Sequence, residues 1–291
     1  MTSAREKFPG GWAAGLRLGW RLPDPSGRAQ TNALCMLIRQ PCIWLVVGLI
    51  ACSSWLTRAG ETNSAILPVP KLEEDSYDWE ARHAEVLRLK DRLNPEIVLI
   101  GDSITHFWGG EPKANQVRGP QSWQSVLGRY RTLNLGFGWD RTQNVLWRLD
   151  HGELDGLHPR VVVLHIGTNN TSDTRNARQN TPAEIAEGIR AILRRVHAKV
   201  PAAHILLMAV FPREEQSDVP RRVQIATLNQ LLAGLAAAEG VSFLDIGPKL
   251  LQPDGTLSRR IMSDFCHPTE RGYQIWADAL APLLLPRPVR P

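Results

Sequence analysis

The amino-acid sequence predicts an α/β protein with three layers, α/β/α, built on a five-stranded parallel sheet. Two observations carry this prediction. Five short apolar runs, rich in β-branched residues or Leu, lie between residues 97 and 244, and stretches with helical periodicity separate them. Strands that are buried on both faces have continuous apolar sequences. Their regular alternation with helices is typical of a parallel sheet covered on both sides.

The expected elements follow one another without an internal repeat. An amphipathic helix from Tyr77 to Leu93 places Trp79 and Val86 among charged residues, and Asn94-Pro95 ends it. Five runs that are too short for helices follow and are interpreted as strands: Ile97–Ile100, Thr132–Leu135, Val161–Ile166, His204–Val210 and Val241–Leu244.

Three further helices can be located from their periodicity. The clearest extends from Pro182 to Ala198, where Thr181 and Glu184 form a capping box and apolar residues repeat along one face. A second contains four leucines at positions 228, 231, 232 and 235 and ends at Gly240. The third extends from Tyr273 to Leu284.

Composition excludes several classes of protein. The chain is 43% hydrophobic and 22% charged, which is the balance of a folded globular protein and not of a disordered, collagen-like or multi-span membrane protein. Lys and Arg number 34 against 29 Asp and Glu, but residues 1–70 hold 7 of these bases and 3 of these acids. The remaining residues are nearly neutral, so we expect no nucleic acid partner, because such binding needs a concentrated basic face.

The N-terminal segment has the features of an export signal. Residues 36–52 form a predicted signal peptide, because Arg39 precedes an apolar core from Cys42 to Ala51, about half of the ~20 residues that span a membrane. Leu49-Ile50-Ala51-Cys52 resembles a lipobox, which predicts lipidation of Cys52 and an exported, membrane-anchored lipoprotein in the periplasm or at the cell surface. A short uncleaved anchor and secretion are the alternatives.

The segments on either side of this signal are not expected to fold. Residues 1–35 show no periodicity and lie upstream of Met36, which we interpret as the true start. Residues 53–76 contain Pro68 and Pro70 and are interpreted as a linker. The folded domain is therefore predicted over residues 77–287.

Small polar residues follow each expected strand. Ligands of such sheets bind beyond the carboxyl ends of the strands, which predicts the functional site at this edge. The segments in question are Gly101-Asp102-Ser103, Gly136 to Asp140, Gly167 to Asn170, Phe211 to Arg213 and, after a long loop, Ser263 to Pro268.

These residue types suit nucleophilic catalysis. Ser103 lies on a turn from a strand to a helix, where its hydroxyl is exposed at the sheet edge. Asp264 and His267 are three residues apart, so the carboxylate can bind the Nδ1 atom of the imidazole and leave Nε2 free to accept the serine proton. The main-chain N–H groups of Gly138 and Trp139 and the side-chain amide of Asn169 can stabilise a developing oxyanion.

Each motif taken alone also has a structural explanation as a turn, a cap or a surface hydrogen bond, but their combination in this order favours catalysis. The other histidines show no metal-ligand spacing, so no metal is predicted, and His165 is interpreted as a core residue with satisfied hydrogen bonds. Cys266 is interpreted as a packing residue, because no second histidine–carboxylate pair serves it.

Four segments resemble the blocks of a known superfamily. Ile-Gly-Asp-Ser-Ile at 100–104, Asn-Leu-Gly-Phe-Gly at 134–138, Gly-Thr-Asn-Asn at 167–170 and Asp-Phe-Cys-His at 264–267 resemble blocks I, II, III and V of the SGNH (GDSL) hydrolases. Residues 133–154 resemble the brain-type platelet-activating-factor acetylhydrolase catalytic subunits and their bacterial relatives.

This resemblance implies a flavodoxin-like sheet of order 2-1-3-4-5 and a catalytic triad of Ser103, His267 and Asp264. It also implies oxyanion donors from the Ser103 N–H group, the block II glycine and Asn169. Relatives usually have Gly-Gly-Asp where this chain has Gly138-Trp139-Asp140. The block II donor is therefore left open between Gly138 and Trp139.

The expected function is a serine esterase that removes small acyl groups through an acyl-enzyme, without a cofactor. The alternatives are a lysophospholipase or other lipid-ester hydrolase and, in another class, a non-catalytic glycan-binding module, which the intact triad disfavours. The oligomeric state is left open, with a homodimer among the alternatives.

An acetylated carbohydrate is the expected substrate. Ten tryptophans outnumber the six Phe and three Tyr, and Trp108 and Trp139 each follow a catalytic block, where their rings could stack on sugars. Asp102, Asp140 and Arg213 are candidate partners for the sugar hydroxyls. The alternative is that these rings close the core, as expected of Trp79, Trp147 and Trp276.

Overall fold

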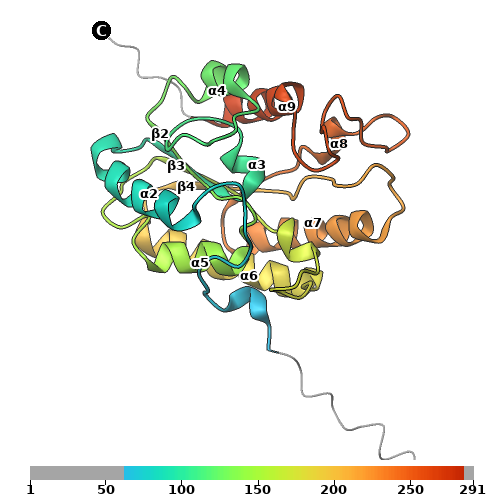
Figure 1. Cartoon of the computed structure of the whole chain (residues 1–291), viewed down its shortest axis with the longest axis horizontal. Coiled ribbons are helices and arrows are strands. Elements are labelled where there is room, and N and C mark those ends of the chain that lie inside the picture. The colour runs from blue at the N-terminus through green and yellow to red at the C-terminus, as the bar shows by residue number, and fades with distance from the viewer. Residues whose placement is uncertain (1–61, 285–291) are drawn as a thin grey trace, which may run out of the picture. The chain divides into compact units, whose positions relative to one another are not determined.

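A computed structural model describes residues 62–284 (Figure 1). Five parallel strands form one sheet in the order β2-β1-β3-β4-β5. This is the predicted fold class and strand order. The strands are β1 (Ile97–Gly101), β2 (Thr132–Gly136), β3 (Val161–His165), β4 (His204–Met208) and β5 (Ser242–Leu244).

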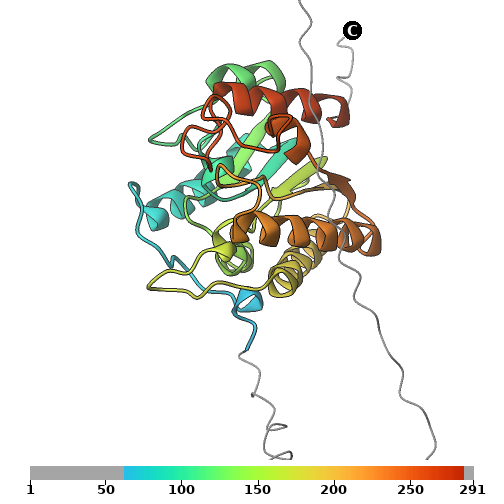
Figure 2. The ribbon, with the colours of Figure 1, turned by 90° about the vertical axis from the view of Figure 1, so that its right-hand side faces the viewer.

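Helices cover both faces of this sheet (Figure 2). One face packs against four helices: α2 (Trp79–Leu93), α5 (Thr142–Asp150), α6 (Pro182–Lys199) and α7 (Pro220–Ala238). The other packs against α3 (Ser103–His106), α4 (Pro120–Val126), α8 (Gly247–Leu250) and α9 (Glu270–Leu280). In β1, Val98 and Ile100 belong to the first core, and Ile97 and Leu99 belong to the second. This alternation explains why the strand sequences are continuously apolar.

Local sequence signals account for the ends of the helices. The capping box predicted for α6 is present, because the Thr181 hydroxyl accepts from the Glu184 N–H group and the Glu184 carboxylate accepts from the Thr181 N–H group. The α2 helix begins at Trp79, two residues later than predicted. Asp78 caps it by accepting a hydrogen bond of 2.9 Å from the Ala81 N–H group.

Residues 62–76, called the N-terminal strap below, pack on the domain, so the prediction that they belong to a linker is wrong. A short 3-10 helix, η2 (Ser64–Ile66), lies against α5 and α6, and Ala65 is fully buried. The Thr142 hydroxyl donates to the Ala65 carbonyl at 2.8 Å, and the Asn144 amide donates to the Pro70 carbonyl at 2.6 Å. The strap comes this close because Gly188 has no side chain: a Cβ there would lie 2.7 Å from the Ala65 oxygen.

Several predictions fall outside the described residues. These are the unassigned residues 1–35, the signal peptide at 36–52, the lipobox and its Cys52. Within residues 62–284, none of the helices is both long and apolar enough to cross a membrane.

His165 lies in the core as predicted, but its hydrogen bonds are not satisfied. Neither ring nitrogen has a partner among the described residues. The ring packs against Phe211 and Trp276, with centroid distances of 4.1 and 5.3 Å. Burial lowers the pKa of His165 to about 3, so the ring is neutral at physiological pH.

Candidate active site

The candidate nucleophile follows the central strand β1. Ser103 is the first residue of α3, and the Asp102 carboxylate caps this turn by accepting from the Ile104 N–H group at 2.9 Å. The turn is tight because Gly101 has no side chain. A Cβ there would lie 2.1 Å from the Thr105 hydroxyl and 2.5 Å from the His165 carbonyl oxygen.

The structure brings together the three residues of the predicted triad. Ser103 Oγ lies 2.8 Å from His267 Nε2, and His267 Nδ1 lies 2.8 Å from Asp264 Oδ2. The other carboxylate oxygen of Asp264 accepts from the His267 main-chain N–H group at 2.7 Å, so the turn itself holds the acid against its own histidine. These are the contacts that a serine nucleophile, its base and an orienting acid require.

The charges around His267 suit a general base. Burial lowers the pKa of His267, although the Asp264 carboxylate opposes this effect. Burial acts to raise the pKa of Asp264, but hydrogen bonds from His267 outweigh it and bring that pKa down to about 2. Asp264 is therefore ionised and His267 neutral at pH 7, the state in which Nε2 can accept the serine proton.

Two predicted oxyanion donors come from the loop after β2. Trp139 adopts a left-handed conformation with a φ of 63°, which costs a non-glycine residue about 1–2 kcal/mol. Within residues 62–284, neither the Gly138 nor the Trp139 N–H group donates a hydrogen bond to the protein. This does not distinguish the two groups, so the choice between them stays open.

Another predicted donor, Asn169, begins the short helix η3 (Asn169–Thr171) that follows β3. Its amide nitrogen donates to the Asp140 carbonyl at 2.9 Å. The neighbouring Asn170 has another role, because its amide nitrogen donates to Thr142, Gln143 and Asn180 inside the protein.

Five of the predicted site residues line a cavity of about 220 Å³, called the active-site cavity below. Its lining contains no Leu, Ile, Val or Met residue. The lining residues are Asp75, Ser76, Ser103, Phe107, Gln116, Trp139, Asn169, Arg213, Cys266 and His267. A larger cavity, of about 600 Å³, lies along α7 and α8, and none of the predicted triad or oxyanion residues lines it.

Five of these lining residues were not predicted as site residues, and one of them, Cys266, is interpreted from the sequence as a packing residue. Asp75 and Ser76 belong to the N-terminal strap, and Phe107 and Gln116 follow α3. The Asn115 amide ties the two segments by donating to the Ser76 carbonyl at 3.0 Å. The only available signal was proximity in sequence, because Phe107 lies four residues after Ser103.

Arg213 and Cys266 both line the cavity. Their two loops are joined, because the Glu214 N–H group donates to the Phe265 carbonyl at 2.9 Å. Burial raises the pKa of the Cys266 thiol to about 12, so it is protonated and a poor nucleophile at neutral pH.

The prediction that Trp108 contacts the substrate is wrong. Its side chain is fully buried in the core below α9, with its ring stacked on Trp276 and Tyr273 at centroid distances of 4.3 and 5.5 Å. The indole N–H group donates to the Ser122 hydroxyl at 3.0 Å. Trp139 differs, because 38% of its surface is exposed and it lines the cavity.

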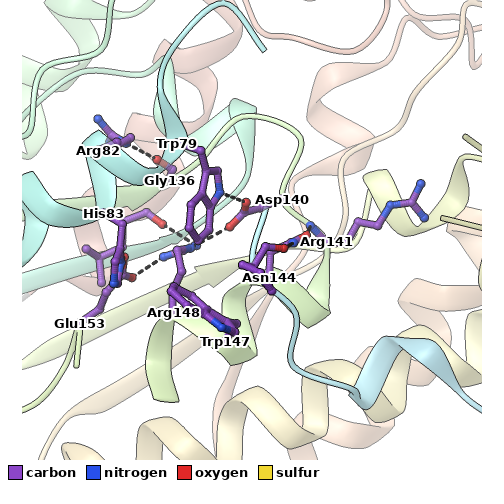
Figure 3. A network of polar contacts seen from close by, with 12 residues as sticks. Trp79, Arg82, His83, Gly136, Asp140, Arg141, Asn144, Trp147, Arg148 and Glu153 are labelled. Atoms are coloured by element: carbon purple, nitrogen blue, oxygen red, sulfur yellow. Dashed lines mark hydrogen bonds and ion pairs between the residues drawn. The ribbon is translucent and has the colours of Figure 1, made fainter. Parts of the chain in front are cut away.

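Asp102 and Asp140 are also too deeply buried to bind sugar hydroxyls, so these two predictions are corrected as well. Asp102 is fully buried at its helix cap. Asp140 does not line the cavity, and it accepts hydrogen bonds from Trp79 and Arg148, each at 2.8 Å (Figure 3). Burial raises the pKa of Asp140 to about 6 against the opposing effect of Arg148.

Comparison with known proteins agrees with this geometry. The chain matches the GDSL-like lipase/acylhydrolase family over residues 99–275, more than half of its length. It is 33% identical to the human platelet-activating factor acetylhydrolase IB subunit alpha1 over 230 residues, which are 78% of this chain and 92% of the relative.

Two solved structures share the fold. A GDSL-like lipase from Bacteroides thetaiotaomicron has a TM-score of 0.55 and 18% identity, with 69% of this chain and 97% of the other chain covered. The acetylxylan esterase Axe2 from Geobacillus stearothermophilus has a TM-score of 0.51 and 20% identity, with coverages of 64% and 92%. Together with the family match, these findings identify the chain as a carboxylic-ester hydrolase that belongs to the GDSL-like lipase/acylhydrolase family.

Proposed function

We propose that this hydrolase removes acetyl and other short acyl groups from carbohydrate esters, with Ser103 as the nucleophile. The composition of the active-site cavity carries the proposal. The cavity is small, it contains the serine and the histidine, and no aliphatic side chain lines it. A long acyl chain needs an extended apolar channel, whereas an acetyl group and a polar alcohol do not.

The proposed reaction has two halves. His267 Nε2 takes the proton of the Ser103 hydroxyl as Oγ attacks the ester carbonyl carbon, and the carbonyl oxygen becomes an oxyanion held by N–H donors such as Asn169. The tetrahedral intermediate collapses, the alcohol leaves with the proton from His267, and an acyl-Ser103 ester remains. Water then attacks this ester, His267 takes its proton, and collapse returns that proton to Ser103 and releases the carboxylic acid.

Two further observations support a carbohydrate as the alcohol. The exposed indole of Trp139 borders the cavity and offers a flat face to a sugar ring. The side chains of Asp75, Gln116 and Arg213 supply hydrogen-bonding groups for hydroxyls around the same opening. The names of the relatives agree in the acyl group, since the human protein is an acetylhydrolase and Axe2 is an acetylxylan esterase.

The test compares acyl chain lengths on the purified enzyme. We expect kcat/KM to fall from p-nitrophenyl acetate through butyrate to octanoate, and acetate to be released from acetylated xylooligosaccharides. Ser103→Ala should abolish both reactions while its thermal unfolding stays close to that of the unsubstituted enzyme. A preference for octanoate would favour the lipid-ester hydrolase, and activity retained in Ser103→Ala would refute the nucleophile.

We also propose that a lipid on Cys52 anchors the exported enzyme to a membrane. The support is the lipobox-like Leu49-Ile50-Ala51-Cys52 after an uncharged apolar run. In a bacterial host fed radioactive palmitate, the protein should become labelled and Cys52→Ala should not. Equal labelling of both proteins would contradict the anchor.

A further inference from the structure

A buried charge network includes Asp140, the residue that follows the proposed oxyanion donors Gly138 and Trp139 (Figure 3). At its centre is Arg148, which is fully buried and forms ion pairs with both Asp140 and Glu153. Glu153 also lies 3.0 Å from His83 Nδ1. Of these residues, none lines the active-site cavity. Burying charged groups costs several kcal/mol unless each is paired. Here Arg148 is paired with both carboxylates, so the network holds these side chains in fixed positions.

Asp140 connects the network to residues 137–140, called the donor loop below. Its Oδ2 atom accepts from Arg148 Nε at 2.8 Å, and its Oδ1 atom accepts from the Trp79 indole at 2.8 Å. Its main-chain N–H group donates to the Phe137 carbonyl at 3.2 Å. That bond closes the turn that contains Gly138 and the left-handed Trp139. The clamped carboxylate therefore fixes the end of the donor loop.

The main-chain carbonyl of Asp140 acts on the other donor. It accepts from Asn169 Nδ2 at 2.9 Å. A primary amide has two N–H bonds, so this contact uses one and leaves the second for a ligand. Asn169 itself lines the active-site cavity. The contact also fixes which way the amide faces, because a rotated amide would lose this bond and place its oxygen against the Asp140 carbonyl oxygen.

We infer that Asp140 is a positioning residue for ester hydrolysis: its buried carboxylate, held by Arg148 and Trp79, fixes the carbonyl that orients the Asn169 amide. The inference rests on the proposed function, because it assumes that Asn169 stabilises the oxyanion. Asp140 does not touch the substrate, but it sets the geometry of Asn169, which does.

Glu153 provides a matched control for Asp140. Both carboxylates are almost fully buried and both bind Arg148, but only Asp140 belongs to the donor loop. We expect Asp140→Asn and Glu153→Gln each to lower the Tm. With p-nitrophenyl acetate, Asp140→Asn should lower kcat by about tenfold with KM within about twofold, since misplacing a catalytic group reduces turnover rather than binding. Glu153→Gln should keep kcat within about twofold of the unsubstituted enzyme. Equal losses of kcat in the two variants would mean that Asp140 is only structural.

A double-mutant cycle tests whether Asp140 acts through Asn169. When Asn169→Ala is already present, adding Asp140→Asn should change kcat by less than about twofold, because the amide that Asp140 orients is gone. Multiplication of the two single effects would overturn the inference.

A milder variant covers the case in which Asp140→Asn does not fold. Trp79→Phe removes the indole donor to Asp140 and keeps an aromatic ring beside Phe137, from which Trp79 now lies 5.4 Å. It should lower kcat by about threefold with an unchanged circular dichroism spectrum, and an unchanged kcat would overturn the inference.

Ser103→Ala distinguishes a failure of the proposed function from a failure of the inference about Asp140. If it retains activity, the proposed function fails, whereas a normal kcat in Trp79→Phe or Asp140→Asn beside an inactive Ser103→Ala defeats only the role of Asp140.

Discussion

At the scale of single residues, Asn169 is a proposed oxyanion donor, so its substitution should affect turnover more than binding. Asn169 is nearly buried, its amide is fixed by the Asp140 carbonyl, and it lines the cavity beside Ser103. Asn169→Ala should lower kcat by ~10²–10³-fold, the usual loss for one oxyanion donor. KM should change little, and steady-state kinetics with p-nitrophenyl acetate measure both constants. A raised KM with an unchanged kcat would instead mean that Asn169 binds the ground state.

The pH dependence of the rate tests the charges around His267. The imidazole must be neutral to accept the serine proton, so kcat/KM should rise with pH and level off above the pKa of His267. Because burial lowers this pKa, the midpoint should fall below the ordinary value of 6.5.

Asp264 raises the pKa of His267 and Arg118 lowers it. Asp264→Asn should therefore move the midpoint to lower pH, and Arg118→Gln should move it to higher pH. Shifts in the same direction would contradict this assignment.

At the scale of the elements, the N-terminal strap is part of the enzyme. It buries Ala65 against α5 and α6, and its last residues, Asp75 and Ser76, form one wall of the active-site cavity. A chain that begins at residue 77 should therefore lose stability and activity together, whereas a chain that begins at residue 62 should keep both. Thermal unfolding and p-nitrophenyl acetate turnover of the two chains give the comparison. Equal Tm and kcat/KM values for the two chains would show that the strap is only a linker.

The elements also show which features sequence patterns can predict. The five strands, the α6 capping box and the meeting of Ser103, Asp264 and His267 followed from apolar runs, capping residues and the shared edge of parallel strands. The packing of the strap was not predicted. Its main-chain carbonyls at Ala65 and Pro70 accept hydrogen bonds from the domain, and a main-chain carbonyl leaves no signal in the sequence.

The burial of Asp140 and Trp108 is the other feature that the sequence patterns do not predict. Asp140 follows a strand at the predicted site edge, which predicts that it reaches the substrate. Its partner Arg148 lies eight residues further along the chain, and their contact forms only in the folded protein. Trp108 follows block I, where a ring could border the site or close the core equally well. Its stacking on Trp276 depends on α9, which lies far along the chain.

At the scale of the whole molecule, the sheet gathers residues that are distant in sequence around one small opening. Asp75, Gln116, Trp139 and Arg213 come from four separate segments, and none of them supplies a group to the Ser103–His267–Asp264 hydrogen bonds. We expect this outer set to recognise the alcohol of the ester, while the triad acts on any acetyl group. Rate and recognition should then respond to different substitutions.

Trp139→Ala separates the two tasks. It removes an exposed indole but keeps the main-chain N–H group, so kcat for p-nitrophenyl acetate should stay within about threefold of the unsubstituted enzyme. KM for an acetylated xylooligosaccharide should rise by about tenfold, because stacking on one aromatic ring contributes on the order of 1 kcal/mol or somewhat more. Trp139→Phe, which keeps an aromatic face, should recover part of that affinity. Equal changes in KM for both esters would exclude sugar stacking by Trp139, because the effect would then arise from the conformation of the donor loop.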